Sequence, residues 1–145
     1  MIRSLRLLLV AGSLLSLVRL GAADSMNMKG EILSSYVKVS SALAADDLAA
    51  AKKAATVVAG HADMAKNKDL AAKAHAVAKA AKIEDARSSF KALSSAIEPM
   101  ARGEAKYVVM NCPMVAADWV QEKGSTRNPY MGKAMLTCGA PKETK

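Results

Sequence analysis

The chain has 145 residues, a formal net charge of +8 and only 3% aromatic residues, a size that fits one small domain. Its lysines and arginines are scattered among acidic residues at helical spacing. A nucleic-acid-binding protein would instead concentrate them in a stripe and add aromatic residues for base stacking. The composition therefore argues against a nucleic-acid partner and favours an ordinary solvated basic surface.

The first 23 residues have the three parts of a secretory signal peptide. A basic start, MIRSLR, precedes the apolar run LLLVAGSLLSLV, and the small residues of Gly21–Ala23 follow as a cleavage site. The apolar run is shorter than the roughly 20 residues that a membrane-spanning helix needs. We therefore expect an exported protein without a membrane anchor. Its mature chain would begin at Asp24, with a net charge of about +5 because three arginines leave with the signal peptide.

Residues 29–102 are rich in alanine, lysine, leucine and valine and contain no proline before Pro99, which favours helices. Apolar residues recur every three or four positions in four segments, and polar breaks at residues 44–47, 66–69 and 82–85 separate these segments. The expected apolar stripes are Ile32, Tyr36, Val39 and Leu43; Leu48, Ala51, Ala55 and Val58; Leu70, Ala74, Val77 and Ala81; and Ala86, Phe90, Leu93, Ile97 and Met100.

Helix-terminating residues agree with this division. Asp46 or Asp47 can cap the start of the second helix, because an aspartate side chain accepts a hydrogen bond from a free N–H group there. Gly103 is placed to end the fourth helix, where glycine adopts the left-handed conformation without strain. Four short amphipathic helices joined by short breaks predict an all-α protein, a small up-and-down four-helix bundle.

The character of the chain changes at about residue 105. The β-branched and aromatic residues of Tyr107–Met110 predict a short strand or an extended segment. The stretch KGSTRNPYMG has turn composition, and MLTCG after it fits a second short strand or a turn. We therefore expect a single domain over residues 24–145, in which a short irregular or β region rich in cysteine and methionine, residues 105–139, follows the helices.

Soft sulfur ligands gather in this C-terminal region. Cys112 and Met114 flank a proline, and Met131, Met135 and Cys138 follow within a short stretch. Thiolates and thioethers together suit Cu(I) or Ag(I), so these five residues form a candidate metal site. The alternative is a disulfide between Cys112 and Cys138, with the methionines as apolar filler, because an exported protein enters an oxidising compartment.

Other kinds of site have no comparable signal in the sequence. The C-x-x-C and H-x-H spacings typical of zinc and thioredoxin-like sites are absent, and His61 and His75 fit a polar surface. There is no Ser-His-Asp set, paired buried carboxylates or glycine-rich phosphate loop, so we expect no enzymatic activity. From the residues alone, a disulfide between Cys112 and Cys138 is the default interpretation, and a soft-metal site is the competing hypothesis.

Residues 112–139, CPMVAADWVQEKGSTRNPYMGKAMLTCG, resemble a bacterial domain of unknown function. That family carries Cys-Pro-Met, then Trp, then Asn-Pro-Tyr-x-Gly and finally Met-Leu-x-Cys-Gly. It occurs as small exported proteins and at the C-terminus of CusB-like periplasmic adaptors of heavy-metal efflux pumps. The helical part is similar as well, for example at Tyr36 and Phe90, so the resemblance covers nearly the whole mature chain.

The resemblance implies a role for particular positions of this sequence. Met131 stands where the family often has an aromatic residue, and the stretch between Met114 and Trp119 is shorter than usual. The resemblance also implies a periplasmic heavy-metal context, with an efflux adaptor as a partner. In that context, binding of Cu(I) or Ag(I) becomes the leading hypothesis, and a disulfide-stapled protein-interaction module without a metal is the alternative. The matching positions are Cys112, Pro113, Met114, Trp119, Asn128, Pro129, Tyr130, Gly132, Met135, Leu136, Cys138 and Gly139. Of these, Pro113, Trp119, Asn128, Pro129, Tyr130, Gly132 and Gly139 are expected to be structural.

Overall fold

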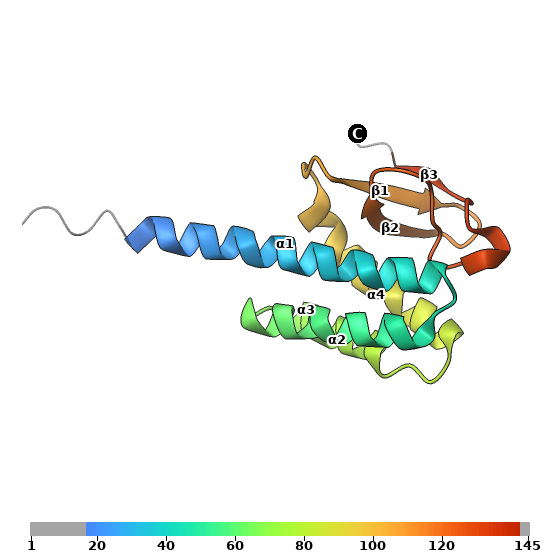
Figure 1. Ribbon diagram of the computed structural model, residues 1–145, viewed down its shortest axis with the longest axis horizontal. Coiled ribbons are helices and arrows are strands. Elements are labelled where there is room, and N and C mark those ends of the chain that lie inside the picture. Colours follow the sequence, from blue (N-terminus) through green and yellow to red (C-terminus); the bar gives the residue numbers. More distant parts are fainter. Residues whose placement is uncertain (1–16, 143–145) are drawn as a thin grey trace, which may run out of the picture.

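The computed structural model describes residues 17–142, which form four helices followed by a small sheet (Figure 1). Residues 1–16 of the expected signal peptide lie outside the described residues, and the first helix runs through its expected cleavage site. Within residues 17–142, no helix is both long and apolar enough to cross a membrane. The elements are α1 (Leu17–Ala44), α2 (Leu48–Met64), α3 (Lys68–Ala78), α4 (Ile83–Ala101), β1 (Tyr107–Cys112), β2 (Ala117–Glu122), the 3-10 helix η1 (Gly132–Met135) and β3 (Ala140–Pro141).

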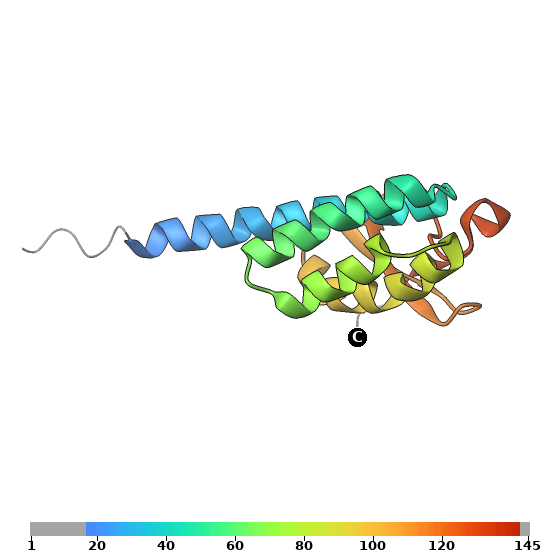
Figure 2. The same ribbon diagram turned by 90° about the horizontal axis from the view of Figure 1, so that it is seen from below.

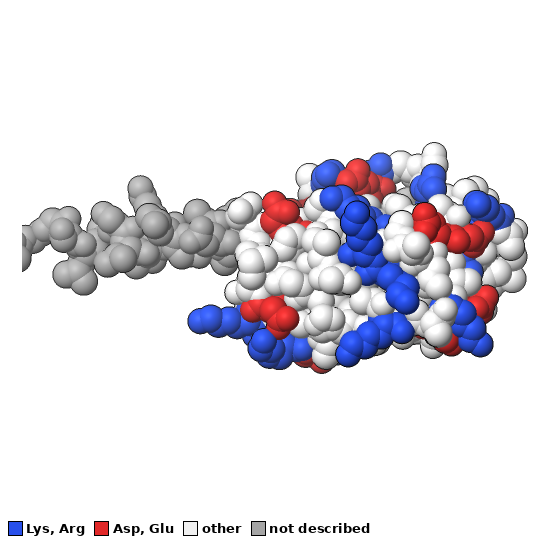
Figure 3. Space-filling view, turned by 60° about the horizontal axis from the view of Figure 1, so that its bottom comes forward, with Lys and Arg blue, Asp and Glu red and all other residues white. Residues whose placement is uncertain are grey.

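The predicted helical bundle is confirmed. Each helix packs against the next one in sequence, and α4 returns to pack against α1 (Figure 2). The buried faces of the two middle helices are dominated by small side chains, which let the helix backbones approach closely. On the outer surface, lysine and arginine side chains form a row with acidic side chains on both sides of it (Figure 3). The buried alanines of α2 and α3 are Ala51, Ala55, Ala59, Ala62, Ala71 and Ala74.

The helix ends follow the expected capping chemistry. The Asp47 carboxylate accepts a hydrogen bond from the Ala50 N–H (2.8 Å) at the start of α2, and Gly103 adopts a φ of +80° after α4.

The predicted apolar stripe of the third helix is wrong at its last position. α3 ends at Ala78, so Ala81 is exposed in the connection to α4, and Ala80 is buried instead.

The all-α prediction also needs correction, because the segment after α4 is an antiparallel sheet with the strand order β2-β1-β3. The predicted strand at Tyr107–Met110 is present and extends to Cys112 as β1. β2 was not predicted, and the MLTCG stretch forms the end of η1 and a turn before β3. The sheet packs on α1 and α4, mainly through β2, so it covers the side of the bundle where the first and last helices meet (Figure 1).

A row of four aromatic rings connects the helices to the sheet. Tyr36 of α1 stacks on Phe90 of α4 with a centroid distance of 5.1 Å, and Phe90 lies 5.7 Å from Tyr130. Tyr130 meets Trp119 of β2 edge to face at 6.2 Å. The chain has only five aromatic residues, so this row holds nearly all of its large aromatic surface in one continuous core.

Buried hydroxyl groups run alongside this row. The Tyr36 hydroxyl lies 2.6 Å from Ser94 Oγ and accepts a hydrogen bond from the backbone N–H of Val120 (3.2 Å). The Tyr130 hydroxyl donates to the backbone carbonyl of Asp118 (2.6 Å) and lies 3.2 Å from the same Ser94 oxygen. Burial raises the pKa of both tyrosine hydroxyls above the ordinary value, so both stay neutral. The network joins α1, α4, β2 and the loop after β2.

A charged clamp, formed by Arg87 and Asp46, fixes that loop to the end of the bundle where α1 meets α2. The Arg87 guanidinium donates to the Asp46 carboxylate (2.5 Å) and to the Pro129 carbonyl (2.8 Å), while the Lys133 N–H donates to Asp46 (3.2 Å). Gly132 lies against this clamp with a φ of +58°, and a Cβ there would collide with the Asp46 and Arg87 side chains. The clamp therefore ties the α1–α2 junction, α4 and η1 together, and only glycine fits beside it.

Replacing Tyr36 by phenylalanine keeps the ring stack and removes the hydroxyl, which leaves the Val120 N–H without its partner. We expect a loss of about 1–3 kcal/mol in the free energy of unfolding, because an unpaired buried donor costs that much. Urea unfolding followed by circular dichroism measures it. Tyr107→Phe is the control, since its hydroxyl makes no hydrogen bond among residues 27–142 and its loss should be nearly neutral.

The ion pair at Asp46 predicts a pH-dependent stability. The Arg87 guanidinium and the Lys133 N–H hold the pKa of the Asp46 carboxyl below its ordinary value. The ionised carboxylate therefore stabilises the fold above its unfolded pKa of about 3.9, and this contribution is lost as the pH falls through the lower folded pKa. Asp46→Asn, which tolerates the φ of 61° at this position, should lower Tm at pH 7, and its Tm should converge with that of the wild type only as the pH falls from about 4 through the lower folded pKa of Asp46.

Thermal melts between pH 7 and pH 2.5 test this convergence. Asp47→Asn is the matched control, because asparagine also serves as a helix cap and Asp47 pairs with no lysine or arginine of the described part of the chain. A difference in Tm between Asp46→Asn and the wild type that does not change with pH would contradict the electrostatic account.

Candidate functional site

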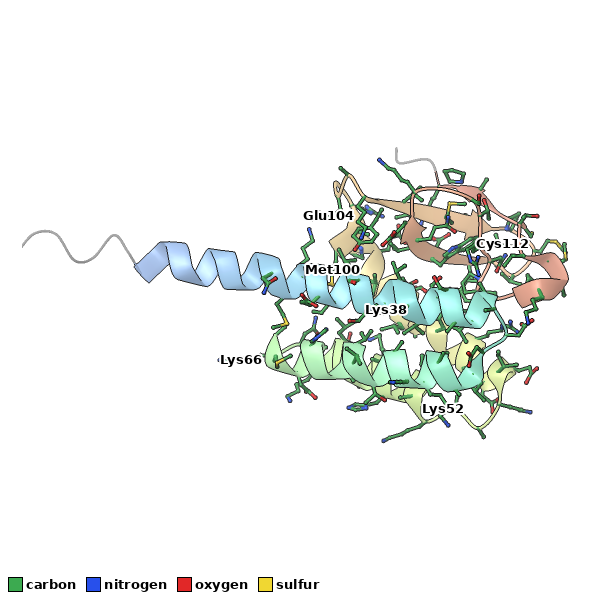
Figure 4. The ribbon with its side chains drawn as sticks, viewed as in Figure 1. Lys38, Lys52, Lys66, Met100, Glu104 and Cys112 are labelled. Carbon is green, nitrogen blue, oxygen red and sulfur yellow. The ribbon has the colours of Figure 1, made fainter. Side chains whose placement is uncertain are left out.

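Three sulfur atoms meet at one end of the sheet, where its central strand β1 finishes. The Cys112 and Cys138 Sγ atoms are 3.2 Å apart, and Cys138 Sγ lies 3.7 Å from the Met114 Sδ. Cys112 is the last residue of β1, Met114 lies in the turn that follows, and Cys138 precedes β3. Figure 4 places Cys112 between the sheet and the segment that carries η1, at the end of the molecule where α1 ends. We call these three residues the sulfur cluster.

Strand register explains why cysteines so far apart in sequence become neighbours. β1 and β3 run antiparallel with Asn111 opposite Ala140, which brings the residues just before Ala140 beside the end of β1. On the other side, Cys112 pairs with Ala117 of β2 across a four-residue turn. In that turn the Ala116 N–H donates to the Pro113 carbonyl (3.3 Å), so the chain reverses at once and Met114 returns toward the cysteines.

Asn128 fixes the backbone around Cys138. Its buried side-chain amide donates to the Cys138 carbonyl (2.7 Å) and accepts from the N–H groups of Tyr130 (2.8 Å) and Met131 (3.2 Å). Its backbone N–H donates to the Leu136 carbonyl (2.7 Å). One asparagine therefore closes both ends of the loop that holds η1, which explains why an asparagine is placed here.

The remaining motif residues shape the same loop. Trp119 is fully buried, and its indole N–H donates to the Gln121 side chain (3.1 Å). Gly139 has a φ of +128°, and a Cβ there would collide with the Trp119 ring and the Asn111 carbonyl. Pro113 is exposed in the turn before Met114. These contacts give the motif residues packing and turn-forming roles close to the sulfur cluster.

The two thiols differ in exposure and in acidity. Cys112 is 0% exposed, whereas Cys138 is half-buried. Burial by itself would raise the pKa of the Cys112 thiol, but hydrogen bonds from Cys138, from the Val115 and Met114 N–H groups and from Asn128 lower it below the ordinary value. The hydrogen bond to Cys112, together with burial, raises the pKa of Cys138. Cys112 is therefore the thiol that ionises first, with Cys138 as its donor.

The structure brings together three of the five predicted sulfur ligands. Met131 precedes η1 and is half-buried, and Met135 ends η1 and is 39% exposed. Among residues 17–142, no thiol hydrogen bond reaches either of these two thioethers. The same part of the chain holds no group of three or more histidine, cysteine, aspartate or glutamate side chains arranged for a metal ion.

Both cysteines are free thiols in this structure. A disulfide needs the sulfur atoms about 2.05 Å apart, so closing one from the observed 3.2 Å requires an approach of roughly 1 Å. The geometry therefore fits two cysteines that act as one unit, either as neighbouring thiolates or as a bonded pair.

A polar network beside the cluster escaped sequence analysis. Asn111 of β1 donates to the Asp118 carboxylate across the hairpin (2.6 Å), and Lys142 Nζ contacts both Asp118 (2.5 Å) and Glu98 of α4 (3.1 Å). The Lys142 N–H also donates to the Val109 carbonyl (2.8 Å), which holds the end of β3 against β1. Asn111 and Asp118 become neighbours only because β1 pairs with β2, and no pattern in the sequence indicates that pairing.

The comparison with known proteins identifies the helical part. A family model described as "Protein of unknown function (DUF3347)" matches residues 32–106, just over half of the chain. No curated protein and no solved structure matches the chain significantly. The match begins at Ile32 in α1 and ends just before β1, so the sulfur cluster and its Cys-Pro-Met motif lie outside it. On the strength of this match, the chain belongs to the DUF3347 family of proteins of unknown function.

Proposed function

We propose that this protein binds Cu(I) or Ag(I) through Cys112, Cys138 and Met114 and serves heavy-metal homeostasis in the periplasm. The observation that carries the proposal is the convergence of three sulfur atoms, with separations of 3.2 and 3.7 Å. The cation is the cargo of the protein in this proposal, rather than a cofactor for a reaction.

The donor set fits a soft monovalent cation. Thiolate and thioether sulfur select Cu(I), whereas a structural zinc site takes four ligands, usually cysteine and histidine. Two thiolates and one thioether give the low coordination number and the soft donors that Cu(I) and Ag(I) accept. The hydrogen bonds from Cys138 and from the Val115 and Met114 N–H groups lower the pKa of Cys112 despite its burial and favour its thiolate, which is the form that binds a metal.

The exposure of the ligands supports transfer rather than permanent storage. Met114 is 64% exposed and Cys138 is half-buried, so one side of the cluster is open to solvent. A cation held there is within reach of thiolate or thioether ligands on another protein, while Cys112 stays buried beneath it. Together with the resemblance to C-terminal domains of efflux adaptors, this exposure makes a periplasmic efflux adaptor the partner that we propose.

Export is part of the same proposal. The signal-peptide pattern over residues 1–23 supports it, and cleavage after Ala23 would shorten α1 to residues 24–44. The buried residues of α1 from Ile32 onward stay in the mature chain. The bundle and the sulfur cluster therefore belong entirely to the exported part.

Competition with a chromophoric Cu(I) chelator tests metal binding on the reduced mature protein. We expect one Cu(I) per chain. Cys112→Ser and Cys138→Ser should each weaken binding by more than the roughly 10–100-fold that loss of an outer-shell partner costs, because each removes a charged soft ligand. Met114→Leu should weaken Cu(I) binding by about tenfold, since it replaces a neutral thioether ligand with an apolar side chain of similar size.

Met64→Leu is the matched control for Met114→Leu, because Met64 at the end of α2 is 62% exposed and lies outside the sulfur cluster. Its binding should equal that of the wild type. Met131→Leu and Met135→Leu show whether the η1 methionines add ligands, and we expect both to keep wild-type affinity. Cysteine variants that compete for Cu(I) as well as the wild type would overturn the proposal.

Export predicts a defined N-terminus. When the full-length gene is expressed in a Gram-negative bacterium, intact-mass analysis of the periplasmic fraction should give a chain that begins at Asp24, because signal peptidase cleaves after small residues. A Gly21→Arg, Ala23→Arg double variant removes the small residues and should leave the precursor uncleaved. Wild-type protein that stays in the cytoplasm at full length would contradict this part of the proposal.

A further inference from the structure

We infer that Cys138 and Cys112 form a thiol–disulfide exchange pair, in which Cys138 reacts first with a small disulfide and Cys112 then closes the internal bond. The inference concerns the metal-free protein and does not depend on Cu(I) binding. It assigns each cysteine a separate chemical role and names the reagent class that would reach this site, a glutathione-type disulfide.

Exposure, rather than acidity, decides which thiol reacts first: the pKa of Cys112 is the lower of the two, but its buried sulfur is out of reach of an external disulfide. Attack on an external disulfide requires that the attacking sulfur and the disulfide come into line, which a buried sulfur cannot achieve. Cys112 is 0% exposed at the end of β1, and Cys138 is half-buried in the turn before β3. Among these two cysteines, only Cys138 is therefore open to a reagent from solvent.

Proximity decides what happens next. The two Sγ atoms are already 3.2 Å apart, so a mixed disulfide on Cys138 would form directly beside the Cys112 sulfur. The Cys138 backbone is fixed by the Asn128 amide on its carbonyl (2.7 Å) and by its own N–H on the Met135 carbonyl (3.1 Å). A reactive group held at this distance meets its target at a very high effective concentration, so closure outpaces a second external encounter.

The exchange balances as two displacements. The Cys138 thiolate attacks one sulfur of the external disulfide, whose S–S bond breaks, and the released thiolate takes up the proton that Cys138 lost. The Cys112 thiolate then attacks Cys138 Sγ, the mixed S–S bond breaks, and the second external thiolate takes up the proton from Cys112. Two electrons and two protons pass from the protein to the reagent, which leaves as two thiols.

The Met114 side chain stands where the reagent would approach. Its thioether lies 3.7 Å from Cys138 Sγ, and the side chain is 64% exposed. Truncating it to alanine would therefore uncover Cys138 without touching the Cys112–Cys138 pair. This gives a variant in which the first displacement should become faster while the second is unchanged.

Incubation with glutathione disulfide, followed by an acid quench and intact-mass analysis, tests the order of events on reduced protein in the presence of a metal chelator. The wild type should become lighter by the mass of two hydrogens, with less than about a tenth of it caught as a mixed disulfide. Cys112→Ser should accumulate one glutathionyl group at Cys138. Cys138→Ser should react at least about tenfold more slowly, because its only thiol is buried. Met114→Ala should react faster than the wild type.

A second measurement uses only the wild type, so it does not depend on the folding of any variant. Peptide mapping after treatment with a limiting amount of N-ethylmaleimide should find Cys138 labelled at least about tenfold more than Cys112. Equal labelling, or a stable mixed disulfide on the wild type, would overturn the inference. These outcomes are separate from the Cu(I) titration, since a metal-free exchange pair can exist whether or not the cluster binds a cation.

Discussion

The buried hydroxyl of Tyr36 is the contact on which the two parts of this fold depend. It lies on a helix, yet it accepts a hydrogen bond from a strand backbone, the Val120 N–H, and also contacts Ser94 of α4. A bundle whose buried faces are largely alanine encloses little apolar area, and small domains of this kind are marginally stable. The sheet adds the missing surface through the aromatic row, and the Tyr36 hydroxyl sets the position at which the sheet docks.

The sulfur cluster takes its geometry from this joint. Tyr130 belongs to the aromatic row, and two residues before it Asn128 holds the carbonyl of Cys138. Between these two residues, the Arg87 guanidinium of α4 donates a hydrogen bond to the Pro129 carbonyl. The loop that carries Cys138 is thus anchored to helices at several points, although it has little regular structure of its own. Sites held by such supporting contacts keep their reactive atoms within the small tolerances that ligand binding needs.

The sequence predicts the helices well because an apolar stripe depends only on neighbouring residues. It fails where distant residues decide the outcome. β2 has a polar residue at half of its positions, and it becomes a strand because Trp119 packs on an aromatic row built from both ends of the chain. The sulfur ligands can be listed from the sequence by residue type, but their spacing does not show which of them meet in the fold. The register of Asn111 with Ala140 brings Cys138 beside Cys112, and no local pattern encodes that register.

The separation between Tyr36 and Val120 also has a consequence for the order in which the molecule assembles. The helices close short loops, whereas this hydrogen bond joins residues 84 positions apart in the sequence, and contacts between distant residues form slowly. We therefore expect each newly made chain to pass through a stage with helices formed and its thiols still far apart. During that interval the two thiols cannot react with each other. The chemistry of the pair begins only when β3 has paired with β1.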